Sequence, residues 1–311
     1  MSKAEFIWWF KDIKKKNIAS VGGKAANLGE MFAKFPIPNG FCVTVKAFEN
    51  FLGNSNIDNK IASLTKNIDV NKQNKIELIS IQIKKLIIKA EMSKELQNSI
   101  IKNYTKIDGF VAVRSSAVAE DLEEASFAGQ QATFLNVKEK DLIKYVKKCW
   151  ASFYTTRAII YREQNKFDHQ PKMAVIVQKM IDAKKSGVIF TVNPVNKNRN
   201  EMIIESVFGL GEALVSGMVT PDHFVVDKNK QKIIKEIINE KKIAIFRKKD
   251  KNITTKFNQQ KANQKTLNDN EINQLIKEAL KIEKHYKKPM DIEWAIDDKI
   301  YILQARPITT L

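Results

Sequence analysis

The residues best suited to chemistry are basic side chains that stand next to glycine or hydroxyl residues. Lys24 follows Gly22-Gly23 and precedes an apolar pattern at helical spacing, so it would stand near the start of a helix. Arg114 ends a short strand-like run and is followed by Ser115-Ser116. A bare glycine backbone with a cation at a helix N-terminus suits a phosphate group, and an arginine beside hydroxyls suits a polyphosphate. The ordinary alternatives are a glycine turn with a solvated lysine and a salt-bridged arginine beside a plain loop.

Two segments near the C-terminus alternate polar and apolar residues. This alternation places Asp291 and Glu293 on one face of a strand, and Gln304 and Arg306 on one face of the next strand. If the two strands pair, a carboxylate, an amide oxygen and a guanidinium converge. Because Mg²⁺ prefers hard oxygen ligands and often shares them with substrate phosphates, the pattern indicates a metal–triphosphate site. The alternative is a hairpin with cross-strand ion pairs.

Two common phosphate-binding signatures fail. A P-loop requires serine or threonine after its Gly-Lys pair, but Ala25 stands there. A dinucleotide-binding fingerprint requires a third glycine, but Leu214 stands in its place after Gly209-Leu-Gly211. If this chain binds a nucleotide, it must therefore use a scaffold other than these two. The glycine-rich tract 207–217 and the following Thr220-Pro221-Asp222 remain a candidate functional segment or a tight loop between lobes.

The elements that would position these residues mix helices and strands without regular alternation, which predicts an α+β fold. We expect a strand over 110–114, a loop over 115–131 and one long amphipathic helix over 142–164. The segments 173–180 and 186–192 are predicted to form an adjacent strand pair.

The rest of the chain favours two lobes. The Lys/Asn/Gln-rich region 228–266 is expected to form an exposed hairpin and loop. A polar stretch containing Pro194 predicts a lobe boundary there, which gives an N-terminal lobe over 1–195 and a C-terminal lobe over 196–311.

Bulk composition narrows the class of protein. The 311 residues are 43% hydrophobic, and no apolar run is long enough for a membrane span, so we expect a cytoplasmic protein. The net charge of +18 raises nucleic acid as a partner, but only 6 of the 53 basic residues are arginine, and the lysines are spread along the chain. We therefore expect no specific nucleic-acid role. Cys42 and Cys149 are expected to be buried structural thiols, and the three histidines lack metal-ligand spacing.

Taken in order, six segments resemble the N-terminal ATP-binding domain of the phosphoenolpyruvate synthase and pyruvate phosphate dikinase family, which rifampicin phosphotransferases share. The resemblance runs from about Ile18 to Pro307. The segments are VGGKAANLGEM, VAVRSSAVAEDLEEASFAGQQATFLNV, VIVQKMI, SGVIFTVNP, ESVFGLGEALVSGMVTPDHF and DIEWA with YILQARP.

The resemblance implies the ATP-grasp fold, in which two α+β lobes hold ATP in the cleft between them. It also implies a role for each matching residue, with ATP and Mg²⁺ as the ligands. The phosphates would be contacted by Lys24, Arg114 and Arg306, and the two arginines would act in catalysis. A covering loop and its flank would include Gly129 and Thr133, and Gln178 would line the adenine pocket. The Mg²⁺ ligands would be Glu293 and Gln304.

The implied reaction is that of a pyruvate, water dikinase, in which ATP, pyruvate and water give AMP, phosphoenolpyruvate and phosphate. Family dikinases also carry a phosphohistidine domain and a phosphoenolpyruvate/pyruvate barrel. Neither is recognised in this sequence, so we expect either that a partner polypeptide carries them or that this sequence is a fragment of a longer protein. Three alternatives stay open: the front end of a rifampicin phosphotransferase-like enzyme, a non-catalytic nucleotide-binding regulatory subunit, and a basic nucleic-acid binder.

Overall fold

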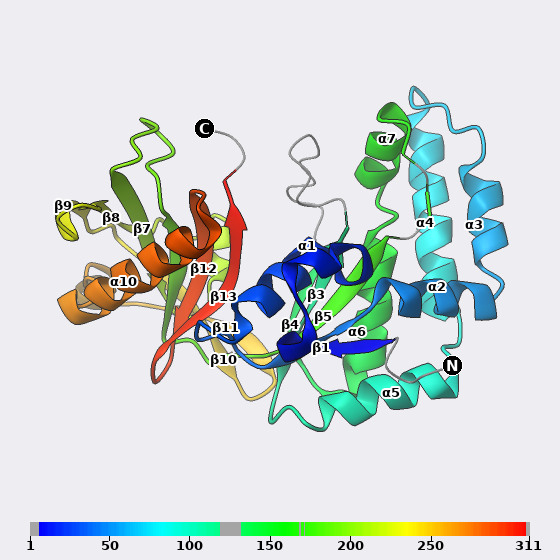
Figure 1. The fold of residues 1–311 in the computed structure, drawn as a ribbon, viewed down its shortest axis with the longest axis horizontal. Helices are drawn as coiled ribbons and strands as arrows, with labels where there is room; N and C mark the ends of the chain where they lie inside the picture. The colour runs from blue at the N-terminus through cyan, green and yellow to red at the C-terminus, as the bar shows by residue number, and fades with distance from the viewer. Residues whose placement is uncertain (1–5, 119–131, 168, 171, 309–311) are drawn as a thin grey trace. The chain divides into compact units, whose positions relative to one another are not determined.

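The computed structural model describes residues 6–118, 132–167, 169–170 and 172–308, and these form two compact units. The first unit comprises Met1–Glu30 and Asn39–Met180, and the second comprises Met31–Pro38 and Ile181–Leu311 (Figure 1). Each unit contains both helices and a β-sheet, which confirms the α+β class.

The first unit is built on an antiparallel five-stranded sheet in the order β1-β2-β5-β3-β4. Val113, Val175 and Val177 lie on one face of this sheet and are fully buried in the main hydrophobic core. The strands are β1 (Ile7–Trp9), β2 (Gly40–Val43), β3 (Val111–Ala117), β4 (Thr133–Val137) and β5 (Met173–Lys179).

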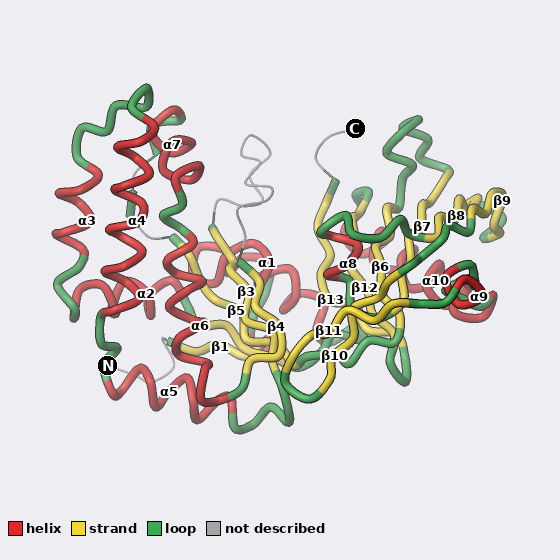
Figure 2. The backbone as a smooth tube through the Cα atoms, turned by 180° about the vertical axis from the view of Figure 1, so that it is seen from behind, coloured by secondary structure: helices red, strands yellow, loops and turns green. Residues whose placement is uncertain are grey.

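Helices pack against this core. Trp150 stacks on Phe48 with ring centroids 4.9 Å apart. The helices of this part of the chain are α1 (Ile18–Phe32), α2 (Val45–Asn54), α3 (Asp58–Thr65), α4 (Gln73–Lys89), α5 (Lys94–Tyr104), α6 (Glu139–Ser152) and α7 (Thr156–Gln164), with short 3₁₀ turns at Phe10–Asp12 and Lys15–Asn17. Figure 2 shows that α3, α4 and α7 lie side by side.

Three sequence-based predictions in this unit need correction. The helix predicted over 142–164 is two helices, because the Thr155 side chain accepts a hydrogen bond from the Ala158 backbone N–H and caps a new helix. The strand predicted to end at Arg114 continues to Ala117, because its backbone stays paired with β5. The predicted pairing of 173–180 with 186–192 is wrong, since the first segment lies in this sheet and the second in the sheet of the other unit.

The second unit contains an antiparallel six-stranded sheet in the order β13-β12-β6-β7-β8-β9. Many apolar side chains of this sheet are buried, in β7 and β8 at consecutive positions, and α10 packs against β12 and β13 (Figure 1). The sheet strands are β6 (Lys185–Phe190), β7 (Glu201–Phe208), β8 (Asp222–Asp227), β9 (Lys232–Ile237), β12 (Met290–Ile296) and β13 (Ile300–Pro307), and the helices are α8 (Glu212–Val215), α9 (Gln259–Ala262) and α10 (Asp269–Tyr286).

The expected hairpin within 228–266 is present as β10 (Ile243–Lys248) paired with β11 (Lys251–Lys256). The expected lobe boundary at 195/196 differs from the division between the units, which falls after Met180. The reason is that β6 hydrogen-bonds to both β7 and β12 and so belongs to the second sheet. No helix in the described part of the chain is both long and apolar enough to cross a membrane.

Candidate functional site

The Gly-Lys turn near the N-terminus is docked closely on strand β3. Gly22 has φ +74° and ψ 167°, a backbone conformation that is essentially restricted to glycine. A Cβ atom on Gly22 would lie 2.2 Å from the Ser116 carbonyl oxygen. Glycine is therefore required here by both the backbone angle and the approach of the strand.

Two serines of β3 hold this turn. The Ser116 hydroxyl donates to the Val21 carbonyl at 2.8 Å and accepts from the Ala25 N–H at 3.1 Å. The Lys24 ammonium, which is buried, donates to the Ser115 carbonyl at 3.4 Å. The Gly-Lys turn and the Arg-Ser-Ser strand, which are far apart in the sequence, thus form one local structure in the first unit.

Arg114 and Gln178 lie side by side on neighbouring strands. Arg114 pairs in register with Ile176 and Ala112 pairs with Gln178, so both polar side chains emerge on the same sheet face. The Arg114 Nη1 atom donates to the Gln178 Oε1 atom at 3.5 Å, and both side chains are buried. The Gln178 Nε2 atom is also buried and has no hydrogen-bond partner among the residues that the structure describes.

An unsatisfied buried amide donor is costly unless a ligand or water accepts its hydrogen bond. The acceptor nitrogens of a purine base would satisfy this donor, and the adenine role of Gln178 stays a prediction. Thr133 pairs in register with Arg114 across the sheet and is exposed at the start of β4. Gly129, predicted to belong to the covering loop, lies outside the described residues.

The second unit carries the other predicted residues on one strand pair. Strands β12 and β13 pair antiparallel, as predicted, with Asp291 opposite Arg306 and Glu293 opposite Gln304. The Arg306 guanidinium donates to one Asp291 carboxylate oxygen from Nε at 2.9 Å and from Nη2 at 2.8 Å. A register shift follows directly after Glu293. The predicted carboxylate, amide and guanidinium therefore do share one sheet face.

Burial and charge oppose each other at Asp291. Removal from water raises the pKa of this carboxyl above its ordinary value, the Arg306 charge acts to lower it, and neighbouring Glu293 raises it slightly. The Asp291–Arg306 pair is the cross-strand ion pair of the alternative interpretation. It also fixes the guanidinium next to the Glu293–Gln304 pair, whose oxygens are of the kind that Mg²⁺ binds. Cross-strand ion pairing was predicted as the alternative for this hairpin, without naming Asp291 as the partner of Arg306.

The glycine-rich tract 207–217 is used for packing in this structure. Gly209 has φ +76°, and a Cβ atom there would lie 2.2 Å from the Ile245 carbonyl oxygen. After the tract, the fully buried Asp222 carboxylate binds the Lys241 ammonium and the Thr266 backbone and hydroxyl. These contacts attach the β10–β11 region to the sheet and give the segment a structural role.

Both cysteines are free and buried, as predicted, and burial raises the pKa of the Cys42 and Cys149 thiols well above its usual value. The described residues contain no group of three or more histidine, cysteine or acidic side chains arranged for a metal ion. The predicted Mg²⁺ ligands, Glu293 and Gln304, are a pair that includes an amide oxygen, and their metal role stays a prediction.

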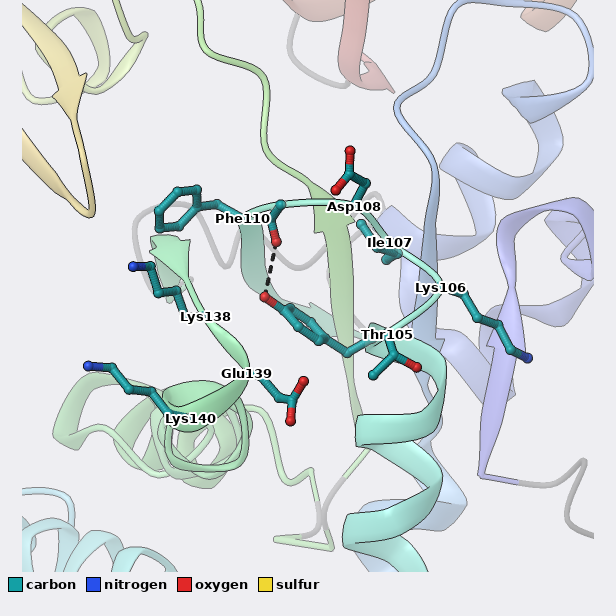
Figure 3. A pocket seen from close by; sticks show the side chains of 10 residues that line it. Thr105, Lys106, Ile107, Asp108, Phe110, Lys138, Glu139 and Lys140 are labelled. Carbon is teal, nitrogen blue, oxygen red and sulfur yellow. Dashed lines mark hydrogen bonds between the residues drawn. The ribbon is translucent and has the colours of Figure 1, made fainter.

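A pocket of about 720 Å³ lies elsewhere in the first unit, between the end of α5 and the start of α6 (Figure 3). Among the lining residues, the Tyr104 hydroxyl donates to the Gly109 carbonyl at 3.0 Å, and the Lys138 ammonium lies 5.0 Å from the Phe110 ring centroid. The predicted nucleotide-binding residues do not line this pocket. Its lysines are accompanied by Asp108 and Glu139, so its charge is mixed.

Comparison with known proteins agrees with the resemblance seen in the sequence. The chain is 47% identical over 315 residues to a probable phosphoenolpyruvate synthase of Archaeoglobus fulgidus, a match that covers 98% of this chain and 42% of that protein. It is 45% identical to a probable phosphoenolpyruvate synthase of Methanocaldococcus jannaschii, covering 99% of this chain and 27% of that protein. It is 41% identical to a rifampicin phosphotransferase of Bacillus cereus, covering 99% of this chain and 36% of that protein.

The chain thus spans less than half the length of these curated relatives. The family described as "Pyruvate phosphate dikinase, AMP/ATP-binding domain" matches residues 18–311. This match includes the Gly-Lys turn, the Arg-Ser-Ser strand and the C-terminal strand pair, and the chain therefore belongs to the pyruvate phosphate dikinase AMP/ATP-binding domain family.

Proposed function

We propose that this chain binds ATP together with Mg²⁺ and is the ATP-binding phosphotransferase module of a phosphoenolpyruvate synthase. The observation that carries the proposal is the docking of the Gly-Lys turn on β3, beside Arg114 and the unsatisfied amide of Gln178. A helix start, a lysine and an arginine supply the positive potential that a triphosphate needs.

Within the first unit, we assign Lys24 and Arg114 to the phosphates and Gln178 to the adenine base, with Thr133 and Gly129 next to the bound nucleotide. In the second unit, we assign Arg306 to the phosphates as well. Phosphoryl transfer depends mainly on positioning and charge neutralisation, which are the contributions that we assign to these residues.

We assign Mg²⁺ to Glu293 and Gln304. The pairing of these two residues across β12 and β13 supports this, because it brings a carboxylate oxygen and an amide oxygen to the same sheet face. When bound, the ion would neutralise phosphate charge. Asp291 would keep the Arg306 guanidinium oriented beside it through the two hydrogen bonds between them.

The activity of the whole enzyme is a further proposal. We propose that a phosphoryl or pyrophosphoryl group passes from ATP to a histidine on a partner polypeptide, or on further domains, that carry the phosphohistidine and phosphoenolpyruvate/pyruvate functions. The names of the A. fulgidus and M. jannaschii relatives, and their greater length, support this assignment. A cytoplasmic location would suit such a reaction.

The test is AMP formation from ATP and Mg²⁺ in the presence of pyruvate, with and without a polypeptide that bears the two further domains. We expect AMP only when that polypeptide is present, and we expect the Arg114→Ala variant to lose it. If the chain binds no ATP at millimolar Mg²⁺, the proposal is wrong at its first step.

The similarity to the B. cereus rifampicin phosphotransferase supports a second candidate acceptor. Replacing pyruvate with rifampicin in the same assay separates the two candidates. AMP formation that depends on rifampicin and not on pyruvate would assign the chain to the second reaction.

A further inference from the structure

The first unit carries an apolar groove on its surface, away from the residues assigned to the nucleotide. Helices α3 and α4 lie side by side (Figures 1 and 2) and enclose a hollow of about 670 Å³. Apolar side chains from both helices and the turns next to them form its floor, namely Ile57, Leu64, Leu86 and Ala90.

The rim of this α3–α4 groove is basic. Lys60 of α3 and Lys85 and Lys89 of α4 line it, and no acidic residue does. All three lysines are exposed, and none forms an ion pair with any residue that the structure describes. Three lysines without an ion-pair partner around an apolar floor favour an occupant that is both apolar and acidic.

Helix α4 extends the same surface. Leu78, Gln82, Lys85 and Lys89 recur at helical spacing, so they lie along one side of α4. Leu78 is 61% exposed, so it adds apolar surface on this side of α4. From Leu78 to Lys89 the surface is about 16 Å long, which corresponds to about three turns of a partner helix.

We propose that the α3–α4 groove binds an acidic amphipathic helix of another polypeptide. A groove between two helices receives the apolar side chains of a third helix, and acidic residues on the flanks of that helix would meet the lysine rim. An extended strand fits less well, because the two helices offer side chains and no free backbone edge. A nucleic acid fits less well, because the floor is apolar and arginine does not line the groove. This inference is independent of the proposed function.

The probe is a fluorescent 18-residue peptide with leucine at every third or fourth position and glutamate at the others, compared with a peptide of the same pattern that has lysine in place of glutamate. Fluorescence anisotropy at physiological salt measures binding to the full chain. We expect the acidic peptide to bind and the basic peptide not to bind. We expect the K60E/K85E/K89E variant to bind the acidic peptide at least tenfold more weakly.

The matched control is the K94E/K102E/K166E variant, which reverses three exposed lysines outside the groove and lowers the net charge by the same amount. It should bind the peptide as the unchanged protein does, and circular dichroism should show all three proteins folded. Equal weakening in both variants would mean attraction by net charge alone and would overturn the proposal. If the acidic peptide does not bind, the proposal is also overturned. This holds even if anionic vesicles or a DNA duplex bind at the groove instead.

Discussion

Replacing Gly22 with alanine tests the docking of the Gly-Lys turn on β3. The added Cβ atom would lie 2.2 Å from the Ser116 carbonyl oxygen and 2.5 Å from the Ser116 carbonyl carbon and hydroxyl oxygen, so the turn or the strand must move. The backbone angles at Gly22 cost a non-glycine residue about 1–3 kcal/mol. Overpacking against a strand backbone adds about 1–3 kcal/mol.

We therefore expect Gly22→Ala to lower the free energy of unfolding by about 2–6 kcal/mol in total. Gly109→Ala is the matched control in the same unit, because Gly109 also has a positive φ, +85°, but its added Cβ would meet nothing within 4 Å. The control should lose only about 1–2 kcal/mol from the backbone angle.

Guanidinium denaturation followed by tryptophan fluorescence is a suitable assay, since three of the four tryptophans lie in the first unit. The Gly22→Ala variant should also lose affinity for ATP, because the turn that carries Lys24 is displaced. If Gly22→Ala and Gly109→Ala unfold with the same free energy, the close contact between the turn and β3 does not exist as described.

Three further predictions concern buried or partly buried polar groups. Burial raises the pKa of the Cys42 and Cys149 thiols, so neither should react with a disulfide reagent at pH 8 in the native protein. Both should react in concentrated guanidinium. Rapid reaction of the native protein would contradict their burial. Asp222→Ala removes the partner of a fully buried lysine and should cost about 3–5 kcal/mol of stability, measured by denaturation, while a loss below about 1 kcal/mol would mean that the buried pair contributes little. Arg306→Gln removes the charge that lowers the pKa of Asp291, so a carbon-13 carboxyl titration should show a further rise. In the variant, the pKa of Asp291 in the folded protein would lie further above its value in the unfolded chain. The free energy of unfolding should therefore fall more between the unfolded pKa and the folded pKa as pH rises. An unchanged pKa of Asp291 would argue against the ion pair.

Periodicity predicted the C-terminal strand pair well. The alternation of Asp291 with Glu293, and of Gln304 with Arg306, depends only on the local twofold repeat of a strand, and the two strands are joined by a short turn. The pairing predicted for this part of the site was therefore confirmed. The register between the two strands, with its shift after Glu293, was not predicted.

Predictions that depended on distant partners were less successful. The segments 173–180 and 186–192 both have strand-like sequences, but alternation does not reveal which sheet a strand joins, and they separated into different sheets. The role of Ser116 was also out of reach, because its hydroxyl bonds to Val21, which is 95 residues away in the chain. That contact depends on the positive φ of Gly22, which the glycine alone does not reveal.

Isothermal titration calorimetry with Mg²⁺-ATP measures whether Arg114 and Arg306 contribute to binding of the nucleotide. We expect one ATP to bind per chain. Arg114→Ala in the first unit and Arg306→Ala in the second should each weaken binding by about 10- to 100-fold, as expected for losing a charge-assisted hydrogen bond worth about 1.5–3 kcal/mol. Arg157→Ala and Arg199→Ala, which replace exposed arginines of the first and second units, should bind as the unchanged chain does. Unchanged affinity in either Arg114→Ala or Arg306→Ala would contradict the role that we assign to that arginine.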